Sequence, residues 1–424
     1  MKIIIIGGGI IGISAAHYLN RSGHEVIVID QTDLQDGCSF GNAGMIVPSH
    51  IIPLASPGMI AKGIRWMFRT DSPFYIRPRF DKKLMQWGWL FYRHSTKKQV
   101  EHAAPALKEL SIFSKLMYRE LAQELPFGFG YEERGLLMLY QTPGAEHEEE
   151  ETARFANRLG VEARILSAAE IQRLEPDVQL NVRGGVYYPG DAHLIPQQLM
   201  PQWISYLSRQ GVVFQLNDAV REFHISNNRI GKVITQHEEF DADEVVLAAG
   251  SWSATLAAKL GIRLPMEAGK GYSFLTDHPA YKIRIPSILL EARVAVTPMG
   301  KQVRVGGTME IAGISHRINM NRVRGIAEAI PRYYPEVKLA LPEPEKVWVG
   351  LRPCSPDGLP YIGRSSRLNN LIIATGHAMM GLSLGAGTGK LIAQLVNREN
   401  PVVPLAPFNP ERFQSLFKKP IAMG

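Results

Sequence analysis

The chain begins with a short apolar run that is followed at once by a glycine-rich turn. Four consecutive isoleucines, Ile3 to Ile6, suit a β-strand that is buried on both faces. Glycines follow at positions 7, 9 and 12, which is the spacing of a turn that binds the phosphates of a dinucleotide. Gly7 permits the tight turn, Gly9 lets a pyrophosphate approach the backbone, and Gly12 lets the next helix pack closely on the strand. Residues 13–20 are then expected to form a helix whose N-terminus faces the phosphates.

An acidic residue completes this pattern at the end of the second predicted strand. Residues 25–30 form that strand, and Asp30 lies 18 residues after Gly12. A carboxylate there can accept hydrogen bonds from both hydroxyls of a ribose. A glycine turn in an unrelated α/β domain is the alternative, but the strand before the glycines and the acidic residue after them favour a dinucleotide site.

Length and composition set broad limits. At 424 residues the chain is long enough for about two to three domains. Its formal net charge of +7 is a mild bias toward anionic substrates or surfaces. The two cysteines, Cys38 and Cys354, lie far apart, form no metal-ligand spacing and favour a reducing compartment. Because the apolar start is interrupted by glycines and no window of about 18 apolar residues exists, we expect no signal peptide, no membrane span and a cytoplasmic protein.

Strands typical of a nucleotide-binding domain occur at the start, in the middle and at the end of the chain. Buried strands that end in glycine turns are predicted within residues 243–252 and at 371–375, and the run from Gly381 to Val396 is expected to be helical. Further helices are expected at 104–125, from 146 and at 195–209, and strands at 135–140, 212–214, 219–225, 230–236 and between 271 and 308. We therefore expect a discontinuous nucleotide domain and a second domain built from the insertions.

Four groups of motifs, in order along the chain, resemble one family. They are Gly7 to Gly12 with Asp30; Cys38 to Gly44 with Pro48 and residues 55–58; Ala249 to Ser253 with Gly269 to Ser273; and Gly350 to Pro353 with Pro356 to Gly363, Gly376, His377, Gly381 and Leu382. On these motifs the chain resembles the D-amino acid oxidase-like (DAO) FAD-dependent oxidoreductases, and most closely the bacterial D-amino acid dehydrogenase branch. The motifs span essentially the whole chain, and together they are far more specific than any one of them.

The resemblance implies an α/β fold with two domains. One is a discontinuous Rossmann-like FAD-binding domain of the glutathione reductase/p-hydroxybenzoate hydroxylase type, and the other is an α+β substrate domain with a mixed antiparallel sheet. We expect the FAD-binding domain at residues 1–60, 192–262 and 346–410, the substrate-binding domain at 61–191 and 263–345, and a C-terminal tail at 411–424.

The resemblance also implies which residues hold FAD. The element from Gly376 to Leu382 is expected to open the last helix and to place backbone amides near the flavin ring. The cofactor residues expected along the chain are Gly7, Gly9, Ile10, Ile11, Gly12, Asp30, Gln31, Ser39, Asn42, Ala43, Gly44, Met45, Val220, Ala249, Gly250, Trp252, Gly376, His377, Met379, Met380, Gly381 and Leu382. Branches with covalent flavin carry a cysteine where this chain has Gly350, so we expect non-covalent FAD, and we expect no metal.

Three residues are assigned to the substrate by the same resemblance. Arg352 would bind a carboxylate, because a guanidinium pairs with both oxygens at once, although a structural arginine in a turn is the alternative. Tyr272 would hydrogen-bond the carboxylate or the amine, unless it is only a packed strand aromatic, and His50 would face the substrate from the loop near the flavin. His193 is expected to be structural. The oxidase branch carries tyrosines on the strand at 293–296, and this chain has none there.

The implied reaction is oxidation of a carbon–nitrogen bond beside a carboxylate. We expect FAD-dependent oxidative deamination of D-amino acids to 2-oxo acids through an imine, by hydride transfer from Cα to flavin N5. D-proline and D-hydroxyproline are candidate preferred substrates. A glycine- or sarcosine-type secondary amine oxidase on the same scaffold is the alternative, and either oxygen or a quinone could accept the electrons.

Residues 62–98 are unusually basic and aromatic. They contain ten Lys or Arg, two Asp and nine aromatic residues. Such a segment could dock a membrane-peripheral respiratory dehydrogenase on anionic lipid at the inner face of the cell membrane. It could equally form the core of the substrate domain and cover the active site. Single-stranded nucleic acid is a third interpretation, but no nucleic-acid module accompanies the segment, so we expect no such partner.

Overall fold

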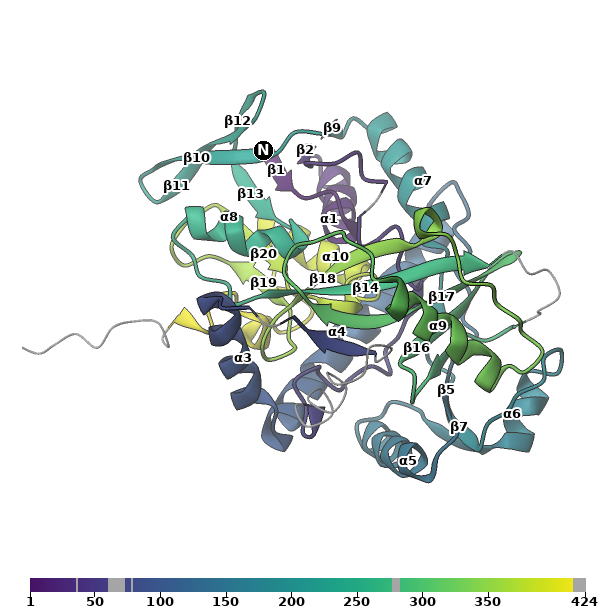
Figure 1. The fold of residues 1–424 in the computed structure, drawn as a ribbon. Helices are drawn as coiled ribbons and strands as arrows, with labels where there is room; N and C mark the ends of the chain where they lie inside the picture. Colours follow the sequence, from purple (N-terminus) through teal and green to yellow (C-terminus); the bar gives the residue numbers. More distant parts are fainter. Residues whose placement is uncertain (36, 60–72, 78, 277–282, 415–424) are drawn as a thin grey trace, which may run out of the picture.

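The computed structural model describes residues 1–35, 37–59, 73–77, 79–276 and 283–414. Two large sheets organise these residues, one with six strands and one with nine. Figure 1 shows that strands from early, middle and late sequence, such as β1, β13 and β20, lie together in the six-stranded sheet. The chain therefore returns to this sheet several times, as the sequence predicts.

The six-stranded sheet has the order β19-β20-β13-β1-β2-β9, and all neighbours are parallel except β19 and β20. Its strands are β1 (Lys2–Ile6), β2 (Glu25–Ile29), β9 (Val213–Gln215), β13 (Glu244–Leu247), β19 (Tyr361–Arg364) and β20 (Leu371–Thr375). Ile3, Ile4 and Ile5 are fully buried at the centre, which suits β-branched residues in a strand covered on both faces. Because parallel strands end at one edge, the turns after β1, β2, β13 and β20 gather there.

Four helices pack together beside this sheet, namely α1 (Ile10–Arg21), α4 (Lys97–Glu124), α7 (Pro196–Arg209) and α10 (Gly385–Val396). Helix α4 falls in the segment that the sequence assigns to the substrate domain, and this assignment is wrong for α4. A Cβ on Gly387 would lie only 2.8 Å from the Cα of Ser114, so α10 and α4 approach closely at small residues. The apolar stripe of α4 therefore belongs to the core of the nucleotide domain.

The nine-stranded sheet has the order β18-β14-β17-β16-β15-β5-β7-β6, with β4 paired to β17. Its strands are β4 (Phe74–Ile76), β5 (Leu136–Tyr140), β6 (Arg164–Ser167), β7 (Gly184–Tyr188), β14 (Glu267–Thr276), β15 (Ser287–Leu289), β16 (Val294–Met299), β17 (Gln302–Ile311) and β18 (Trp348–Cys354). Only the pairs β5–β15 and β4–β17 are parallel, so the sheet is mixed. The boundary predicted at residue 346 is too early, because β18 is hydrogen-bonded along its whole length to β14.

The remaining elements cover the sheets or connect them. They are α3 (Lys82–His94), α5 (Pro143–Arg158), α6 (Ala168–Leu174), α8 (Ser253–Lys259), α9 (Met320–Tyr333), the pair β3 (Met45–Ile46) and β8 (Ala192–His193), and the small sheet β10 (Val220–Ser226), β11 (Arg229–Thr235) and β12 (Glu239–Asp241). Short 3₁₀ turns include η1 (Gly250–Trp252) and η3 (Ala378–Met380). Helix α9 packs on the nine-stranded sheet through one buried apolar face.

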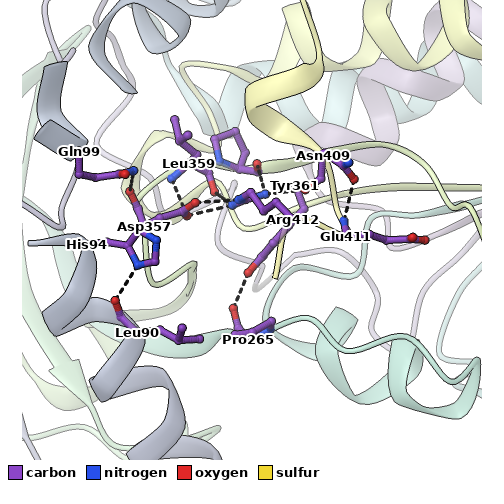
Figure 2. A network of polar contacts seen from close by, with 11 residues as sticks. Leu90, His94, Gln99, Pro265, Asp357, Leu359, Tyr361, Asn409, Glu411 and Arg412 are labelled. Atoms are coloured by element: carbon purple, nitrogen blue, oxygen red, sulfur yellow. Dashed lines mark hydrogen bonds and ion pairs between the residues drawn. The ribbon is translucent and has the colours of Figure 1, made fainter. Parts of the chain in front are cut away.

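A buried ion pair fastens the C-terminal part of the described chain. Figure 2 shows Arg412 pointing at Asp357; its Nε donates to Oδ2 at 2.7 Å and its Nη2 to Oδ1 at 2.9 Å. The guanidinium lies 4.1 Å from the ring centroid of Tyr361, and Asp357 is only 3% exposed. Residues 411–414, predicted as the start of a tail, are therefore part of the folded body.

The basic and aromatic segment is only partly visible, because residues 60–72 and 78 lie outside the described residues. In α3, Trp87 is buried and its Nε1 donates to the carbonyl oxygen of Cys354 at 2.9 Å, whereas Trp89 is 52% exposed. Trp87 thus has the core role and Trp89 does not. No helix within the described residues combines the length and the apolar character needed to cross a bilayer.

Candidate active site

A large cavity of about 1670 Å³ is lined by residues of both large sheets and of the loops that follow their strands. Arg352, Tyr272 and His50 line it, and so do nearly all of the residues predicted to hold the cofactor. Gly12, Gly44 and Gly376 do not line it. A Cβ on each would lie 1.9 Å from the Gly7 oxygen, 2.2 Å from the Leu194 oxygen and 2.8 Å from the Tyr361 ring, respectively. These three glycines therefore permit close packing behind the wall and do not form its surface.

The glycine turn after β1 has the shape that its sequence predicts. Gly7 has a φ of +108°, and a Cβ there would lie 2.5 Å from the carbonyl oxygen of Ala248. Gly9 is the N-cap of α1, so the N-cap residue has no side chain of its own to cap the helix. Gly9, Ile10 and Ile11 line the cavity, so the positive end of the α1 dipole faces it.

Asp30 lies directly after β2 at the same edge of the sheet. Its Oδ2 accepts a hydrogen bond from the Gly8 amide at 2.7 Å, and its Oδ1 accepts one from the Thr32 amide at 2.9 Å. Thr32 Oγ1 also donates to Oδ1, at 3.0 Å, so these contacts fix the group, and Oδ2 keeps capacity for a ligand hydroxyl. The turn and the acidic side chain are thus held together before any ligand binds.

The loop at residues 38–44 forms the next part of the wall. Ser39 Oγ accepts from the Ile10 amide at 2.9 Å, which ties the loop to the start of α1. A Cβ on Gly41 would lie 1.9 Å from the ring of Trp348, and one on Gly350 would lie 2.0 Å from the same ring. Trp348 therefore fills the space between the loop and β18, and both glycines are needed to admit it.

The opposite wall is the segment that follows β20. Gly376 has a φ of +79°, and η3 separates it from α10, which begins only at residue 385. The predicted element therefore ends in a 3₁₀ turn and does not itself open the last helix. Tyr118 donates its hydroxyl to the Leu382 carbonyl at 2.6 Å, and Ser383 Oγ accepts from the Val47 amide at 2.9 Å. These bonds hold the backbone of 379–382 against the cavity.

Burial fixes the charge state of His377. Its pKa is lowered to about 3 by burial, so the imidazole is neutral at physiological pH. The ring nitrogen Nε2 lies 3.1 Å from Thr388 Oγ1 inside α10. His377 therefore contributes to the cavity wall as a neutral group.

Arg352 lies on β18, opposite Gly269 of β14, and points along the cavity wall. A Cβ on Gly271 would lie 2.2 Å from its Nη2, so the guanidinium occupies the space above a glycine. Its Nη1 donates to the carbonyl oxygen of Thr308 at 2.5 Å. Burial lowers the pKa of this partly buried arginine, but not enough to discharge a guanidinium. Among the described residues Arg352 has no carboxylate partner within ion-pair distance.

Thr308 holds Arg352 at a cost in backbone geometry. Its φ is +68°, a left-handed conformation that is a genuine outlier for a β-branched residue. Thr308 is 6% exposed and lies where the pairing of β17 with β14 shifts register, because Lys270 pairs with Glu310 but Tyr272 pairs with Gly307. Strain of this kind persists where the surrounding fold enforces it, and it often accompanies functional sites.

Tyr272 lines the cavity, but its hydroxyl is already engaged. It donates to Glu310 Oε2 at 2.9 Å and accepts from the Asn319 amide at 3.2 Å. Glu310 also lies 3.3 Å from Lys270 Nζ in a buried ion pair. Burial is the main cause that raises the pKa of Tyr272, so the phenol keeps its proton. In this arrangement Tyr272 presents its ring, and the proposal that it bonds the substrate needs a rotated hydroxyl.

His50 belongs to a chain of polar groups that leads away from the cavity. Asp191, which is 1% exposed, accepts from the Ser49 amide at 3.0 Å and from Ser49 Oγ at 2.5 Å. Ser49 Oγ in turn lies 3.1 Å from His50 Nδ1. Burial lowers the pKa of His50 to about 4 and raises that of Asp191 to about 7. His193 is buried beside this chain on β8, as expected for a structural residue.

Three features of the cavity are suited to FAD, namely the glycine turn, Asp30 and the volume. Gly7 and Gly9 leave backbone without side chains beside the N-terminus of α1, where Ser39 Oγ engages the Ile10 amide. A glycine turn before a helix N-terminus is the arrangement that binds a pyrophosphate. Asp30 stands where a ribose is expected. A volume of about 1670 Å³ exceeds the roughly 300–1,000 Å³ of a pocket for one small ligand, so a dinucleotide and a substrate can share it.

Several residues of the site were not found from the sequence. Thr308, Ser49, Asp191, Glu149 and Arg293 all belong to the site or support it, and none carries a motif. Their only common signal is structural, because each is placed by contacts between distant segments. Asp191 alone had a local hint, since it follows Pro-Gly in a turn beside the predicted structural His193.

Known proteins resemble the chain over its whole length. The family model described as FAD dependent oxidoreductase (DAO) matches residues 2–395. The D-amino acid dehydrogenase of Methylobacterium radiotolerans is 32% identical, with 95% of this chain and 97% of that protein covered. The D-amino acid dehydrogenase of Neisseria meningitidis is 30% identical, with 98% and 100% covered.

Solved structures share the same architecture. Glycine oxidase from Geobacillus kaustophilus matches with a TM-score of 0.76 at 22% identity and covers 97% of this chain and 99% of its own. L-proline dehydrogenase from P. horikoshii matches with a TM-score of 0.74 at 20% identity and covers 98% of each chain. These likenesses confirm the predicted fold of a Rossmann-like domain beside a mixed-sheet domain.

Proposed function

Because the chain belongs to the DAO family of FAD-dependent oxidoreductases, we propose that it deaminates D-amino acids to 2-oxo acids through an imine. The names of the curated relatives, which are D-amino acid dehydrogenases, support this choice of substrate. When bound, FAD supplies the two-electron acceptor for the hydrogen at the substrate Cα. The substrate loses two electrons and becomes an imine, which water converts into a 2-oxo acid and ammonium.

The observation that carries the proposal is the guanidinium of Arg352. It lines the cavity, has no carboxylate partner among the described residues, and is held by the Thr308 carbonyl above Gly271. A fixed and partly buried cation of this shape suits a substrate carboxylate, which can pair with both outer nitrogens at once. Arg352 would therefore place the Cα of an amino acid at a constant position in the cavity.

The amine needs a neutral group that can take up or share its proton. With Asp191 ionised, Ser49 Oγ donates to Asp191 and its lone pairs face His50, so His50 carries its proton on Nδ1. That tautomer leaves the Nε2 lone pair of a cavity-lining residue available to the substrate ammonium. We assign His50 this role, and we assign Ser49 and Asp191 the role of holding its tautomer.

Non-covalent FAD is part of the same proposal. Cys354 is fully buried and does not line the cavity, and Gly350, where covalent branches carry their cysteine, lies against the ring of Trp348. Cys38 lines the cavity, but its thiol donates to the Leu351 carbonyl at 2.9 Å. Denaturation in trichloroacetic acid should release all of the flavin into the supernatant, and flavin that stays with the precipitate would contradict this.

The substrate is tested by a panel of donors. D- and L-amino acids, D-proline, hydroxy-D-prolines, glycine and sarcosine are each offered with a dye acceptor and with oxygen alone. We expect D-amino acids to give the highest kcat/KM, with D-proline and hydroxy-D-prolines among the better donors. Preference for glycine or sarcosine would instead support a glycine oxidase-like reaction, which the likeness of fold to glycine oxidase also allows.

One surface supports a second proposal, that the enzyme docks on anionic lipid and passes its electrons to a quinone. Met85, Trp89 and Tyr92 of α3 are 66%, 52% and 67% exposed, and their spacing of four and three residues places them on one face. Phe80, just before α3, is fully exposed, and Arg93 stacks on Trp89 at 4.9 Å. Exposed aromatic and basic side chains together suit a membrane interface.

Vesicle binding tests this surface. The protein should sediment with vesicles of phosphatidylglycerol and phosphatidylethanolamine at low salt and be released at high salt. The double variant Met85→Ser, Trp89→Ser should lose most of this binding, whereas Ile112→Ser, an exposed apolar residue on α4 that is 48% accessible, should not. Equal binding by all three proteins would exclude α3 as the docking face.

A further inference from the structure

Glu149 is a buried carboxylate that the proposed reaction does not use. On α5 it shares one buried face with Ala153 and Ala156, at a spacing of four and three residues, where an apolar side chain is expected. It is 7% exposed and lines the cavity. Its Oε1 accepts a hydrogen bond from the Tyr188 hydroxyl at 3.1 Å, and it has no cationic partner within ion-pair distance among the described residues.

Charged residues of α5, among them Glu148 and Arg154, also line the cavity, but Glu149 lies on the helix face that packs on an apolar cluster. The cavity-lining residues that pack in the same cluster between α5 and the nine-stranded sheet are Met138, Ile288, Leu290, Ala295 and Phe155. An apolar surround makes a charged carboxylate costly unless a ligand or water pairs with it. Burial accordingly raises the pKa of Glu149 to about 7.

Arg293 connects Glu149 to the site of Arg352. A Cβ on Gly307 would lie 3.1 Å from the Arg293 carbonyl oxygen. Thr308, which follows Gly307 on β17, accepts the hydrogen bond from Arg352 with its own carbonyl oxygen. The positive charge of Arg293 lowers the pKa of both Glu149 and His50, so it acts on both groups. Arg293 lines the cavity, is exposed and has a φ of +53° in the turn before β16.

We propose that Glu149 and Arg293 form a subsite for a hydroxyl group on the side chain or ring of the substrate. The proposal rests on the D-amino acid reaction above and names the class of D-amino acid that is preferred. A hydroxyl can donate to a carboxylate and accept from a guanidinium, so it suits a subsite that presents both groups. A cationic side chain would meet Arg293 and an anionic one would meet Glu149, so each would be repelled by one of the two.

The preference for a hydroxylated substrate follows from the free-energy cost of leaving the Glu149 carboxylate without a hydrogen-bond donor. A substrate with a plain methyl or methylene at the same place displaces water and leaves the carboxylate without a donor. Sites built to bond a hydroxyl discriminate strongly against the analogue that lacks it. Because the cavity is open to water, we expect a preference of at least about tenfold in kcat/KM rather than the largest values known for closed sites.

The experiment compares three pairs of substrates that differ by one hydroxyl. They are D-serine and D-alanine, D-homoserine and D-2-aminobutyrate, and 4-hydroxy-D-proline and D-proline. The ratio of kcat/KM within each pair is measured for the wild type, for Glu149→Gln, for Glu149→Leu and for the control Glu150→Gln. Glu150 is the next residue on the helix, pairs with Arg154 and does not line the cavity. Thermal unfolding of each protein shows whether it is folded.

The expected result is a ratio above about ten for at least one pair in the wild type and in Glu150→Gln. Glu149→Leu should lose that preference at least tenfold while its rate on the plain member of the pair is kept or raised, and Glu149→Gln should retain part of it. Ratios near one in the wild type, or an unchanged ratio in Glu149→Leu, would overturn the subsite while leaving D-amino acid oxidation standing. If no D-amino acid is oxidised, the proposed function fails and the subsite with it.

Discussion

The cavity has two ends that are built in different ways. The glycine-rich end is formed by residues 7–11, 30, 39–43, 45 and 377–382, and backbone and small side chains make much of its wall. The side-chain end is formed by Arg352, Thr308, His50, Arg293 and Glu149, each from a different strand, helix or loop. The first end recognises a ligand through shape and backbone amides, and the second through charges whose positions depend on long-range contacts. Substitutions at the glycine-rich end should therefore impair cofactor binding, and those at the side-chain end should impair substrate binding or change stability.

The largest effect is expected at the glycine-rich end. In Gly12→Ala the added Cβ would lie 1.9 Å from the Gly7 carbonyl oxygen, so the turn between β1 and α1 must move. We expect FAD affinity to fall at least about 100-fold, because phosphate-binding amides act only when they converge. Flavin absorbance of the purified protein and titration of the apoprotein with FAD measure this.

A matched glycine makes the control for this variant. Gly144 is the second residue of α5, and a Cβ there meets nothing within 4 Å, so Gly144→Ala should bind FAD like the wild type. If Gly12→Ala, shown to be folded by circular dichroism, retained its flavin equally well, the turn would not be the cofactor site that we describe.

A smaller effect, on stability, is expected at the side-chain end. The pKa of Glu149 is about 7 in the folded protein against 4.5 in the unfolded chain, so the folded state holds an extra proton between these values. The unfolding free energy should therefore fall as pH rises from 4.5 to 7, by roughly 3 kcal/mol from this group. Tyr188, Arg293 and Glu148 also act on this carboxyl.

Chemical denaturation at pH 5 and pH 7.5 measures this decline. Glu149→Gln cannot ionise, so its stability should decline less over the same interval, while Glu150→Gln should follow the wild type. If stability declined equally with pH in the wild type and in Glu149→Gln, the carboxyl would be well solvated, and the argument that its surroundings make a charge costly would be weakened.

The smallest effect concerns the strained residue that holds Arg352. In Thr308→Gly the left-handed φ of +68° costs nothing, so the loss of a buried side chain is offset, and the unfolding free energy should change by less than about 1 kcal/mol. Thr297→Gly, at a fully buried position of β16 without a positive φ, should lose roughly 2–3 kcal/mol. KM for D-amino acids should rise a few-fold in Thr308→Gly only. Equal destabilisation by both changes would show that Thr308 carries no strain.

The difference between the ends also decides what could be predicted from the sequence. The first strand, glycine turn and Asp30 lie within 30 residues, and the signals that predict them are local, so the fold of this end was foreseen. Arg352 was found because it stands in a conspicuous Gly-Leu-Arg-Pro motif. The roles of these residues stay predictions until variants are measured.

The rest depends on pairings that local sequence does not encode. The sheet to which β18 belongs is decided by its register with β14, and the domain to which α4 belongs is decided by small residues on α10. Glu149 sits in an amphipathic helix among other glutamates, and only the fold distinguishes the buried one from its exposed neighbour Glu148. The strained φ of Thr308 likewise has no counterpart in the sequence.

The most direct test of the account is rapid mixing of Arg352→Met with a D-amino acid under anaerobic conditions. The variant should retain its flavin, and the apparent affinity for the substrate should fall at least about 100-fold, because a buried carboxylate loses its charge-assisted partner. Loss of the flavin peak near 450 nm follows the reaction. The wild type should bleach rapidly with D-amino acids. Unchanged bleaching by the variant at low substrate concentration would contradict the central claim that Arg352 anchors the carboxylate.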